Sequence, residues 1–252
     1  MLAALHVHFL PALTTPEVLR DGVVIVLDIL RASTTITAAL VNGAVEVLPF
    51  QEVADAEAAA KDYPRESVIL GGERGGLPIP GFDCGNSPSE YSPERVAGKK
   101  VLFTTTNGTL AMMHCKLASQ VFIGSFVNLA AVVERLATLH NGRAVHLLCA
   151  GTGRSVTRED TLCAGAIVHG LQDQIGDETS RNDQMTLALD AWRAVLRGQE
   201  QITLTQLQLE LRNTQGGRNL HRIGLDADLA DCAALDCYKL VPELKLAEWT
   251  IA

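Results

Sequence analysis

The sequence predicts a three-layer α/β/α fold, in which helices cover both faces of a mostly parallel or mixed sheet. Short runs rich in β-branched residues alternate with alanine- and leucine-rich helical stretches along most of the 252 residues, a pattern typical of βαβ units. Hydrophobic residues make up 47% of the chain, enough for a core of ordinary size. We expect one unit over residues 1–252. A division into two α/β lobes stays open, because no change in composition marks a boundary.

The first strong strand signal is Val23–Leu27, a run of five apolar residues. A helix over Thr34–Val41 follows, with Ser33 and Thr34 as expected caps at its start and Asn42-Gly43 as its stop. Before this strand, an N-terminal strand should carry His6 and His8 as packing or surface residues. After the helix, the pattern predicts strands over Val45–Phe50, Val68–Leu70 and Val101–Phe103, and a helix over Glu52–Asp62.

The middle of the chain continues the alternation, and the last third departs from it. The middle predicts a helix ending at Leu117, strands Gln120–Gly124 and Ala144–Cys149, helix Leu129–His140 with Asn128 as N-cap, and helix Thr161–Gln174. Helices over Asp183–Arg197 and Thr205–Leu211 follow. The segment NTQGGRNLHRIG then predicts a glycine-rich turn, and the tail YKLVPELKLAEWTIA an extended segment.

Composition excludes several classes of function. The net charge is −8, which argues against the basic face of a nucleic-acid-binding protein. No apolar run reaches the roughly 18 residues of a membrane helix. The N-terminus lacks the pattern of a signal peptide, and none of the six cysteines forms a CxxC pair. We therefore expect a cytoplasmic protein with reduced thiols and without a nucleic-acid or membrane partner.

Unusual polar residues follow five of the predicted strands. They are Asp28, the pair Glu73 and Arg74, the loop from Thr104, Ser125, and the CAGTG stretch at Cys149. In open parallel sheets, ligands bind outside the carboxyl ends of the strands. We expect these loops to line one crevice, with Cys149 more plausible as a buried structural thiol than as a nucleophile.

The stretch VVIVLDILRAST closes a buried strand with a carboxylate and places an arginine three residues later. Asp28 could be a metal ligand or a nucleophile, and Arg31 could hold an anion. The alternative is a helix-start aspartate paired with a nearby arginine.

The segment LGGERGGLPIPGFDCGNSPSEY is rich in glycine and proline, which predicts an irregular loop. Glu73 and Asp83 are hard oxygen ligands suited to Mg²⁺. Arg74 could bind a phosphate or a carboxylate, and Asn86 adds a neutral donor. The alternative is a surface loop whose charges are merely solvated.

Two further loops offer groups for anions and metals. The stretch TTTNGT, residues 104–109, could form an oxyanion cradle at a helix start. A threonine-rich turn closed by Asn-Gly is the alternative and, for this stretch alone, the commoner case; the candidate binding residues are Thr104, Thr105, Thr106, Asn107 and Gly108. In CAGTGRSVTRED, Arg154 could hold an anion. Glu159 and Asp160 could be metal ligands or acids that complement a helix dipole.

The motifs DILRASTTI, LGGERGGLPIPGFDCGNSPSEY, TTTNGT, GSFVN, CAGTG…TREDTLCAGA and RNLHRIGLDADLADC occur in the order seen in the 2-phosphosulfolactate phosphatase family. The resemblance runs from about Val23 to Pro242. The family motif often reads LRATTT, and Ser33 here keeps the hydroxyl. Asp28 is followed by Ile29 and Leu30, so the DxDxT pattern of haloacid-dehalogenase phosphatases is absent.

The resemblance implies an α/β hydrolase that uses Mg²⁺ to convert (2R)-2-phospho-3-sulfolactate and water to 3-sulfolactate and phosphate, a step of coenzyme M biosynthesis. Together with the residues above, it suggests Asp28, Arg31, Glu73 and Arg74 as catalytic groups. Asn86, residues 104–108 and Arg154 would bind the substrate. The suggested metal ligands are Asp28, Glu73, Asp83, Glu159 and Asp160.

Three questions stay open from the sequence. The substrate could be another small phospho-acid, and a non-catalytic protein that binds an anionic metabolite is a second alternative. Water attack on phosphorus is the preferred mechanism, with a phospho-Asp28 intermediate as the other route. We expect a small anionic phosphoester as partner, and a homo-oligomer only from the base rate for such enzymes.

Overall fold

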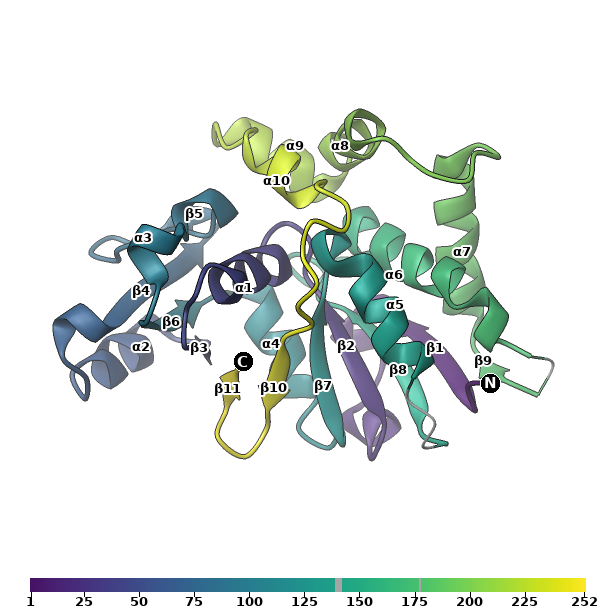
Figure 1. The fold of residues 1–252 in the computed structure, drawn as a ribbon, viewed down its shortest axis with the longest axis horizontal. Helices are drawn as coiled ribbons and strands as arrows, with labels where there is room; N and C mark the ends of the chain where they lie inside the picture. Colours follow the sequence, from purple (N-terminus) through teal and green to yellow (C-terminus); the bar gives the residue numbers. More distant parts are fainter. Residues whose placement is uncertain (139–141, 177) are drawn as a thin grey trace.

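The computed structural model describes residues 1–138, 142–176 and 178–252, and its strands form one 11-stranded sheet (Figure 1). The strands are β1 (Ala4–His8), β2 (Val23–Leu27), β3 (Glu46–Phe50), β4 (Val68–Arg74), β5 (Leu77–Pro78), β6 (Lys100–Thr104), β7 (Gln120–Gly124), β8 (Ala144–Cys149), β9 (Ser180–Arg181), β10 (Glu243–Lys245) and β11 (Thr250–Ile251). Their order across the sheet is β5-β4-β6-β3-β11-β10-β7-β2-β8-β1-β9.

Helices pack on this sheet and over one of its edges. The α-helices are α1 (Ala32–Val41), α2 (Val53–Ala60), α3 (Pro93–Val96), α4 (Asn107–His114), α5 (Leu129–Ala137), α6 (Arg158–Gly170), α7 (Asp183–Leu196), α8 (Leu204–Arg212), α9 (Gln215–Arg222) and α10 (Asp228–Cys232). Short 3₁₀ helices span Pro11–Leu13, Pro16–Leu19, Arg65–Ser67, Pro88–Glu90, Phe126–Asn128 and Gln172–Gln174. In the described ranges, no helix has the length and apolar character needed to cross a membrane.

The α/β fold is confirmed, and the sheet is mixed: two parallel blocks are joined by an antiparallel pair of strands. One parallel block contains β4, β6 and β3, and another contains β7, β2, β8, β1 and β9. The C-terminal segment lies between them as the antiparallel pair β10–β11. The extended tail predicted from the sequence is therefore the bridge between the two blocks. Whether the blocks are separate lobes stays a prediction.

Strand β2 is apolar without a break because both of its faces are buried. Val23, Ile25 and Leu27 belong to a core shared with α5, α6 and α7. Val24 and Val26 belong to a second core shared with α1 and α4. A strand covered on two faces shows continuous rather than alternating hydrophobicity.

The predicted glycine-rich turn at NTQGGRNLHRIG is wrong, because helix α9 occupies most of it. The Thr214 hydroxyl caps this helix by accepting a hydrogen bond from the Gly217 N–H at 3.1 Å. A Cβ on Gly217 would lie 2.0 Å from the Leu211 carbonyl oxygen. The glycine therefore serves close packing of α9 against the end of α8, which sequence signals alone do not reveal.

The prediction of an irregular loop after Leu70 is also wrong in part. Strand β4 continues to Arg74 and turns back into β5. A Cβ on Gly71 would lie 2.1 Å from the Tyr91 hydroxyl, and one on Gly72 would lie 1.9 Å from the Thr104 carbonyl oxygen. These glycines let the strand pass close to its neighbours, so here they mark close packing rather than a break.

Two helix starts differ from the prediction: α1 begins two residues before the predicted Thr34, and the side chains expected as caps of α1 and α5 make other contacts. Helix α1 begins at Ala32 without a side-chain cap. The Ser33 hydroxyl accepts a hydrogen bond from the Asp28 N–H, and the Thr34 hydroxyl donates one to the Ile29 carbonyl. Asn128 precedes α5 but accepts from the Ser125 N–H. The predicted end of that helix, His140, lies outside the described residues.

Candidate active site

A cavity of about 580 Å³ lies at the carboxyl ends of β2, β4, β6 and β8, with α9 as its opposite wall. Figure 1 shows α9 above the sheet. Four of the five predicted strand-end loops meet there. The fifth does not contribute, because Ser125 is fully buried in hydrogen bonds with Asn128. The cavity is lined by Asp28, Leu30, Arg31, Glu73, Gly75, Gly76, Asn86, Thr105, Thr106, Asn107, Thr152, Gly153, Gly216, Asn219, Leu220, Arg222 and Ile223.

Asp28 lies at the floor of this cavity, directly after β2. Its Oδ1 accepts a hydrogen bond from the Ala32 N–H at 3.4 Å. A Cβ built on Gly108 would lie 2.9 Å from Asp28 Oδ2, so this oxygen lies against the first turn of α4. Burial raises the pKa of Asp28 to about 7, and the negative charges of Glu73 and Glu159 add to the effect. The carboxyl group can therefore exchange a proton near neutral pH.

Glu73, at the end of β4, fixes the loops beside Asp28. Its Oε2 accepts a hydrogen bond from the Gly76 N–H at 2.7 Å, and its Oε1 accepts one from the Thr106 N–H at 3.1 Å. The side chain is only 8% exposed. Glu73 thus connects the β4–β5 turn to the start of α4 while it lines the cavity.

The TTTNGT loop forms the N-terminal turn of α4. The Thr105 hydroxyl accepts the Thr109 N–H at 3.2 Å. In the described structure, the N–H groups of Asn107 and Gly108 have no acceptor. Unsatisfied N–H groups at a helix N-terminus attract anions, so this turn offers two donors close to Asp28.

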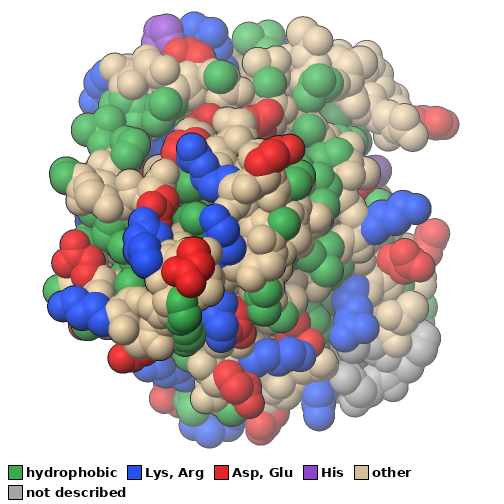
Figure 2. Space-filling view, turned by 60° about the vertical axis from the view of Figure 1, so that its left-hand side comes forward, with side chains coloured by type: hydrophobic (Ala, Val, Ile, Leu, Met, Phe, Trp, Pro, Cys, Tyr) green, Lys and Arg blue, Asp and Glu red, His purple; other side chains and the backbone are tan. Residues whose placement is uncertain are grey.

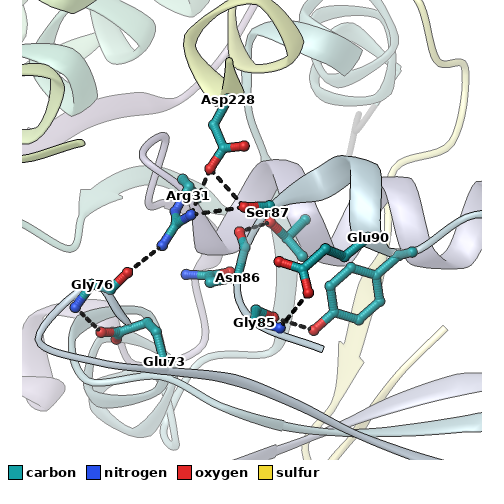
Figure 3. Close-up of polar contacts among 10 residues, drawn as sticks. Arg31, Glu73, Gly76, Gly85, Asn86, Ser87, Glu90 and Asp228 are labelled. Carbon is teal, nitrogen blue, oxygen red and sulfur yellow. Dashed lines mark hydrogen bonds and ion pairs between the residues drawn. The ribbon is translucent and has the colours of Figure 1, made fainter. Parts of the chain in front are cut away.

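Arg31 lies in the cavity wall with its guanidinium already engaged (Figure 3). It forms an ion pair of 2.5 Å with Asp228, and the two side chains are 2% and 4% exposed. Its Nη1 also donates to the Ser87 hydroxyl at 3.1 Å, and its Nη2 donates to the Gly76 carbonyl at 2.8 Å. Arg31 therefore joins three segments of the chain.

Two buried oxygen atoms near the cavity, Asn86 Oδ1 and Glu159 Oε2, have no hydrogen-bond partner in the part of the chain that the structure describes. Asn86 lines the cavity, and Figure 3 shows its side chain directed toward the space between Arg31 and Glu73. The other oxygen of Glu159 accepts the Gly216 N–H at 3.1 Å. Burial raises the pKa of Glu159. Buried polar atoms without partners are rare and indicate a missing ligand, proton or water.

Asp160, in contrast, is fully engaged within the protein. Its carboxylate accepts hydrogen bonds from the Ile29 N–H, the Gly151 N–H and the Thr157 hydroxyl, all at 2.8–2.9 Å. Burial raises the pKa of Asp160, and the charges of Asp28 and Glu159 contribute. Asp160 joins the loops that follow β2 and β8 and does not line the cavity.

Several other residues singled out from the sequence lie away from the cavity. Arg74 donates to the carbonyls of Glu73 and Gln51. Asp83 pairs with Arg65 and accepts the Leu70 N–H. Thr104 is fully buried, and Arg154 is exposed beyond the lining residue Gly153. Cys149 is also fully buried, and burial raises the pKa of its thiol.

The donor set fits Mg²⁺ only in part by itself. Across residues 1–138, 142–176 and 178–252, no three His, Cys, Asp or Glu side chains come together as a ready metal site. Mg²⁺ often binds through one or two carboxylates, with substrate phosphates and waters as the other ligands. Asp28 and Glu73 both line the cavity, and their negative charges repel each other. A cation would relieve this repulsion, so the two carboxylates suit a Mg²⁺ ion whose other ligands are substrate phosphate and water.

Sequence reasoning missed the wall formed by α9 and the partner of Arg31. Asn219 and Arg222 line the cavity from α9, and Asp228 begins α10. Their spacing of three residues would have placed Asn219 and Arg222 on one helix face, but the preceding Gly-Gly pair favoured a turn. Nothing local in the sequence connects Arg31 to Asp228.

Outside the cavity, Figure 2 shows Lys and Arg side chains intermixed with Asp and Glu over the face that it draws. Charges of both signs lie close together there, so they offset one another at a distance.

Comparison with known proteins gives a consistent result. A family model described as 2-phosphosulpholactate phosphatase matches residues 8–247. A protein of Symbiobacterium thermophilum named "Probable 2-phosphosulfolactate phosphatase" is 40% identical over 226 residues, which cover 90% of this chain and 92% of the relative. Proteins with the same name from Caldicellulosiruptor saccharolyticus and Synechococcus sp. (strain CC9605) are 36% and 38% identical, and the matches cover 90–92% of both chains.

Proposed function

The chain belongs to the 2-phosphosulfolactate phosphatase family, and we propose that it hydrolyses (2R)-2-phospho-3-sulfolactate to 3-sulfolactate and phosphate with the help of Mg²⁺. The observation that carries this proposal is the position of Asp28 Oδ2 against the first turn of α4, where two N–H groups have no acceptor. A proton-exchanging carboxyl beside an anion-binding turn is what transfer of a phosphoryl group to water requires.

In this proposal the N–H groups of Asn107 and Gly108 bind oxygens of the phosphoryl group, and Asn86 contributes its side-chain amide. Asp28 orients a water molecule and accepts its proton as the water oxygen bonds to phosphorus. The bond between phosphorus and the ester oxygen breaks, and the ester oxygen leaves with the sulfolactate and takes a proton from solvent to become its hydroxyl group. Backbone donors that are already in place stabilise the charge on the transferring oxygens without reorganisation.

Mg²⁺, held by Asp28 and Glu73, would neutralise charge on the phosphoryl oxygens and orient the substrate. Arg31 has a different role from the anion clamp expected from the sequence, because its guanidinium pairs with Asp228. It would hold the loops that carry the binding groups. By the family's reaction, we assign the chain to the cytoplasm and to coenzyme M biosynthesis.

The first test is phosphate release by the purified protein from 2-phosphosulfolactate, beside phosphoglycerate and phospholactate. Each reaction is run with Mg²⁺ and with EDTA. We expect release that depends on Mg²⁺, is fastest on the sulfonate, and falls at least a hundredfold, about 2.7 kcal/mol, in Asp28→Asn. Asp190→Asn, at an exposed position of α7, is the matched control and should keep full activity.

Other outcomes would change the proposal in defined ways. Equal or faster release from the other phospho-acids would keep the chemistry and replace the substrate. No release from any ester would favour a protein that binds an anionic metabolite. Labelled phosphate trapped on Asp28 during turnover would replace direct water attack with a covalent route.

A further inference from the structure

The two walls of the cavity differ in chemistry. One wall, formed by the ends of β2, β4 and β6, carries Asp28, Glu73 and the first turn of α4. The opposite wall is one face of α9, with Asn219 and Arg222 as its polar side chains. The proposed phosphoryl site uses the first wall and Asn86, so α9 is free to recognise another part of the substrate.

The charges that line the cavity are unevenly compensated. Within the described residues, four charged side chains line it: Asp28, Glu73, Arg31 and Arg222. The charge of Arg31 is neutralised by its buried ion pair with Asp228. Arg222 has no carboxylate within ion-pair distance in the same described ranges, and its hydrogen-bond partner there is neutral: its Nη2 donates to the Asn219 Oδ1. Arg222 therefore supplies the uncompensated positive charge of the cavity.

Helix α9 can bind a ligand through its side chains but not through the N–H groups of Gly216 and Gly217, because these already have acceptors. The Gly216 and Gly217 N–H groups donate to Glu159 Oε1 and to the Thr214 hydroxyl. In the contact between Arg222 and Asn219, the amide oxygen of Asn219 is the acceptor. The NH₂ group of Asn219 takes no part in this bond, so it can donate to a ligand. A guanidinium and an amide on one helix face form a forked donor set that suits an oxyanion.

We propose that Asn219 and Arg222 form the subsite for an acid group of the substrate that is not transferred, a sulfonate or a carboxylate. This inference rests on the proposed function and extends it, because it assigns the selectivity for multiply charged phosphoesters to α9. Arg222 binds the acid group, and Asn219 orients the guanidinium. Neither residue touches the transferring phosphorus.

The kinetic test compares Arg222→Ala, Arg222→Lys and Arg193→Ala, an exposed arginine of α7, as a matched control. The esters are 2-phosphosulfolactate, phospholactate, 2-(phosphooxy)ethanesulfonate and isopropyl phosphate, which lacks both acid groups. We expect Arg222→Ala to raise KM for 2-phosphosulfolactate by about tenfold to a hundredfold with little change in kcat. Arg222→Lys should restore part of the affinity, and the control should match the wild type.

The four esters distinguish the two acid groups. If Arg222 holds the sulfonate, the substitution leaves KM for phospholactate nearly unchanged. If it holds the carboxylate, KM for 2-(phosphooxy)ethanesulfonate is nearly unchanged. An equal rise in KM on isopropyl phosphate would overturn the inference, because the loss would then not depend on a second acid group.

Calorimetric binding of 3-sulfolactate and of inorganic phosphate separates this inference from the proposed function. Arg222→Ala should lower the affinity for 3-sulfolactate and leave the affinity for inorganic phosphate unchanged. Wild-type protein that hydrolyses none of the esters but binds 3-sulfolactate through Arg222 would refute the phosphatase proposal and retain the subsite. Hydrolysis with unchanged 3-sulfolactate affinity in the variant would refute the subsite and retain the phosphatase. Equal unfolding midpoints of all the variants exclude a folding defect.

Discussion

At the residue scale, the candidate site depends on a close contact between Asp28 and Gly108, where there is no room for a larger side chain at position 108. Asp28 follows β2 and lies against Gly108 at the start of α4. The sequence predicted both residues as parts of the site, since each follows a buried strand. The reason for the glycine was not predictable from the sequence: the Asp28 carboxylate occupies the space that a side chain at position 108 would need.

We predict that Gly108→Ala lowers kcat/KM by at least about tenfold, or 1.4 kcal/mol. The added Cβ would lie 2.9 Å from Asp28 Oδ2 and 3.0 Å from the Ala32 Cβ, so the carboxylate must move. Phosphate release and the unfolding midpoint are measured together. The double variant Gly108→Ala with Ala32→Gly relieves only the contact with Ala32. Full recovery of activity in it would show that the Asp28 contact is unimportant.

At the scale of elements, the pairing of β1 with β8 brings histidines into contact. His6 lies opposite His146 in the register, and the His8 Nε2 lies 3.0 Å from the His146 Nδ1. Burial lowers the pKa of His8 and of His146 to about 4, and the neighbouring histidines add to the effect. The expected N-terminal strand is present, but its pairing partner could not be read from the sequence.

This pair predicts a loss of stability in mild acid. In the unfolded chain histidine titrates near 6.5, so between about pH 6.5 and pH 4 the unfolded state binds more protons than the folded state. The free energy of unfolding should therefore fall as the pH falls through this range, by on the order of 2 kcal/mol for each histidine. Urea unfolding from pH 7.5 to 4.5 measures it. His146→Gln should flatten the dependence, and an unchanged slope in this variant would contradict the prediction.

At the scale of the whole molecule, one buried ion pair connects layers that are distant in the sequence. Arg31 follows the interior strand β2, and Asp228 begins α10, 197 residues later. The Ser87 hydroxyl donates to the same Asp228 oxygen at 2.9 Å. Helix α10 is thereby fixed to the end of β2 through Arg31, which also lines the cavity.

We predict that Asp228→Ala lowers the free energy of unfolding by about 3–5 kcal/mol, because it leaves Arg31 buried and uncompensated. The exposed pair of Arg158 with Glu210, at 2.7 Å, is the control, and Arg158→Ala should cost less than about 1 kcal/mol. Denaturant unfolding of both variants gives the comparison. Equal losses in the two variants would mean that burial does not determine the strength of the Arg31 pair.

The sequence by itself determined the class of fold, the family and several of the parallel strands. Strands β2, β7 and β8 were predicted residue for residue, because their hydrophobic runs are local signals. Asp28, Arg31, Glu73, Asn86 and the 105–107 loop were predicted as site residues and all line the cavity; their chemical roles stay predictions. Asp83 and Arg154 were chosen by residue type alone, and type does not tell which way a loop faces.

Only the tertiary structure decided what closes the site. Helix α9 contains a Gly-Gly pair that disfavours a helix locally, and it forms because Gly217 packs against the end of α8. The C-terminal tail becomes a hairpin between two parallel blocks because β3 and β7 both leave an edge open to it. Such partners are distant in sequence, as Arg31 is from Asp228. Local propensity predicts the secondary structure of a segment. Which other segment it packs against depends on burial and hydrogen bonds that exist only in the assembled fold.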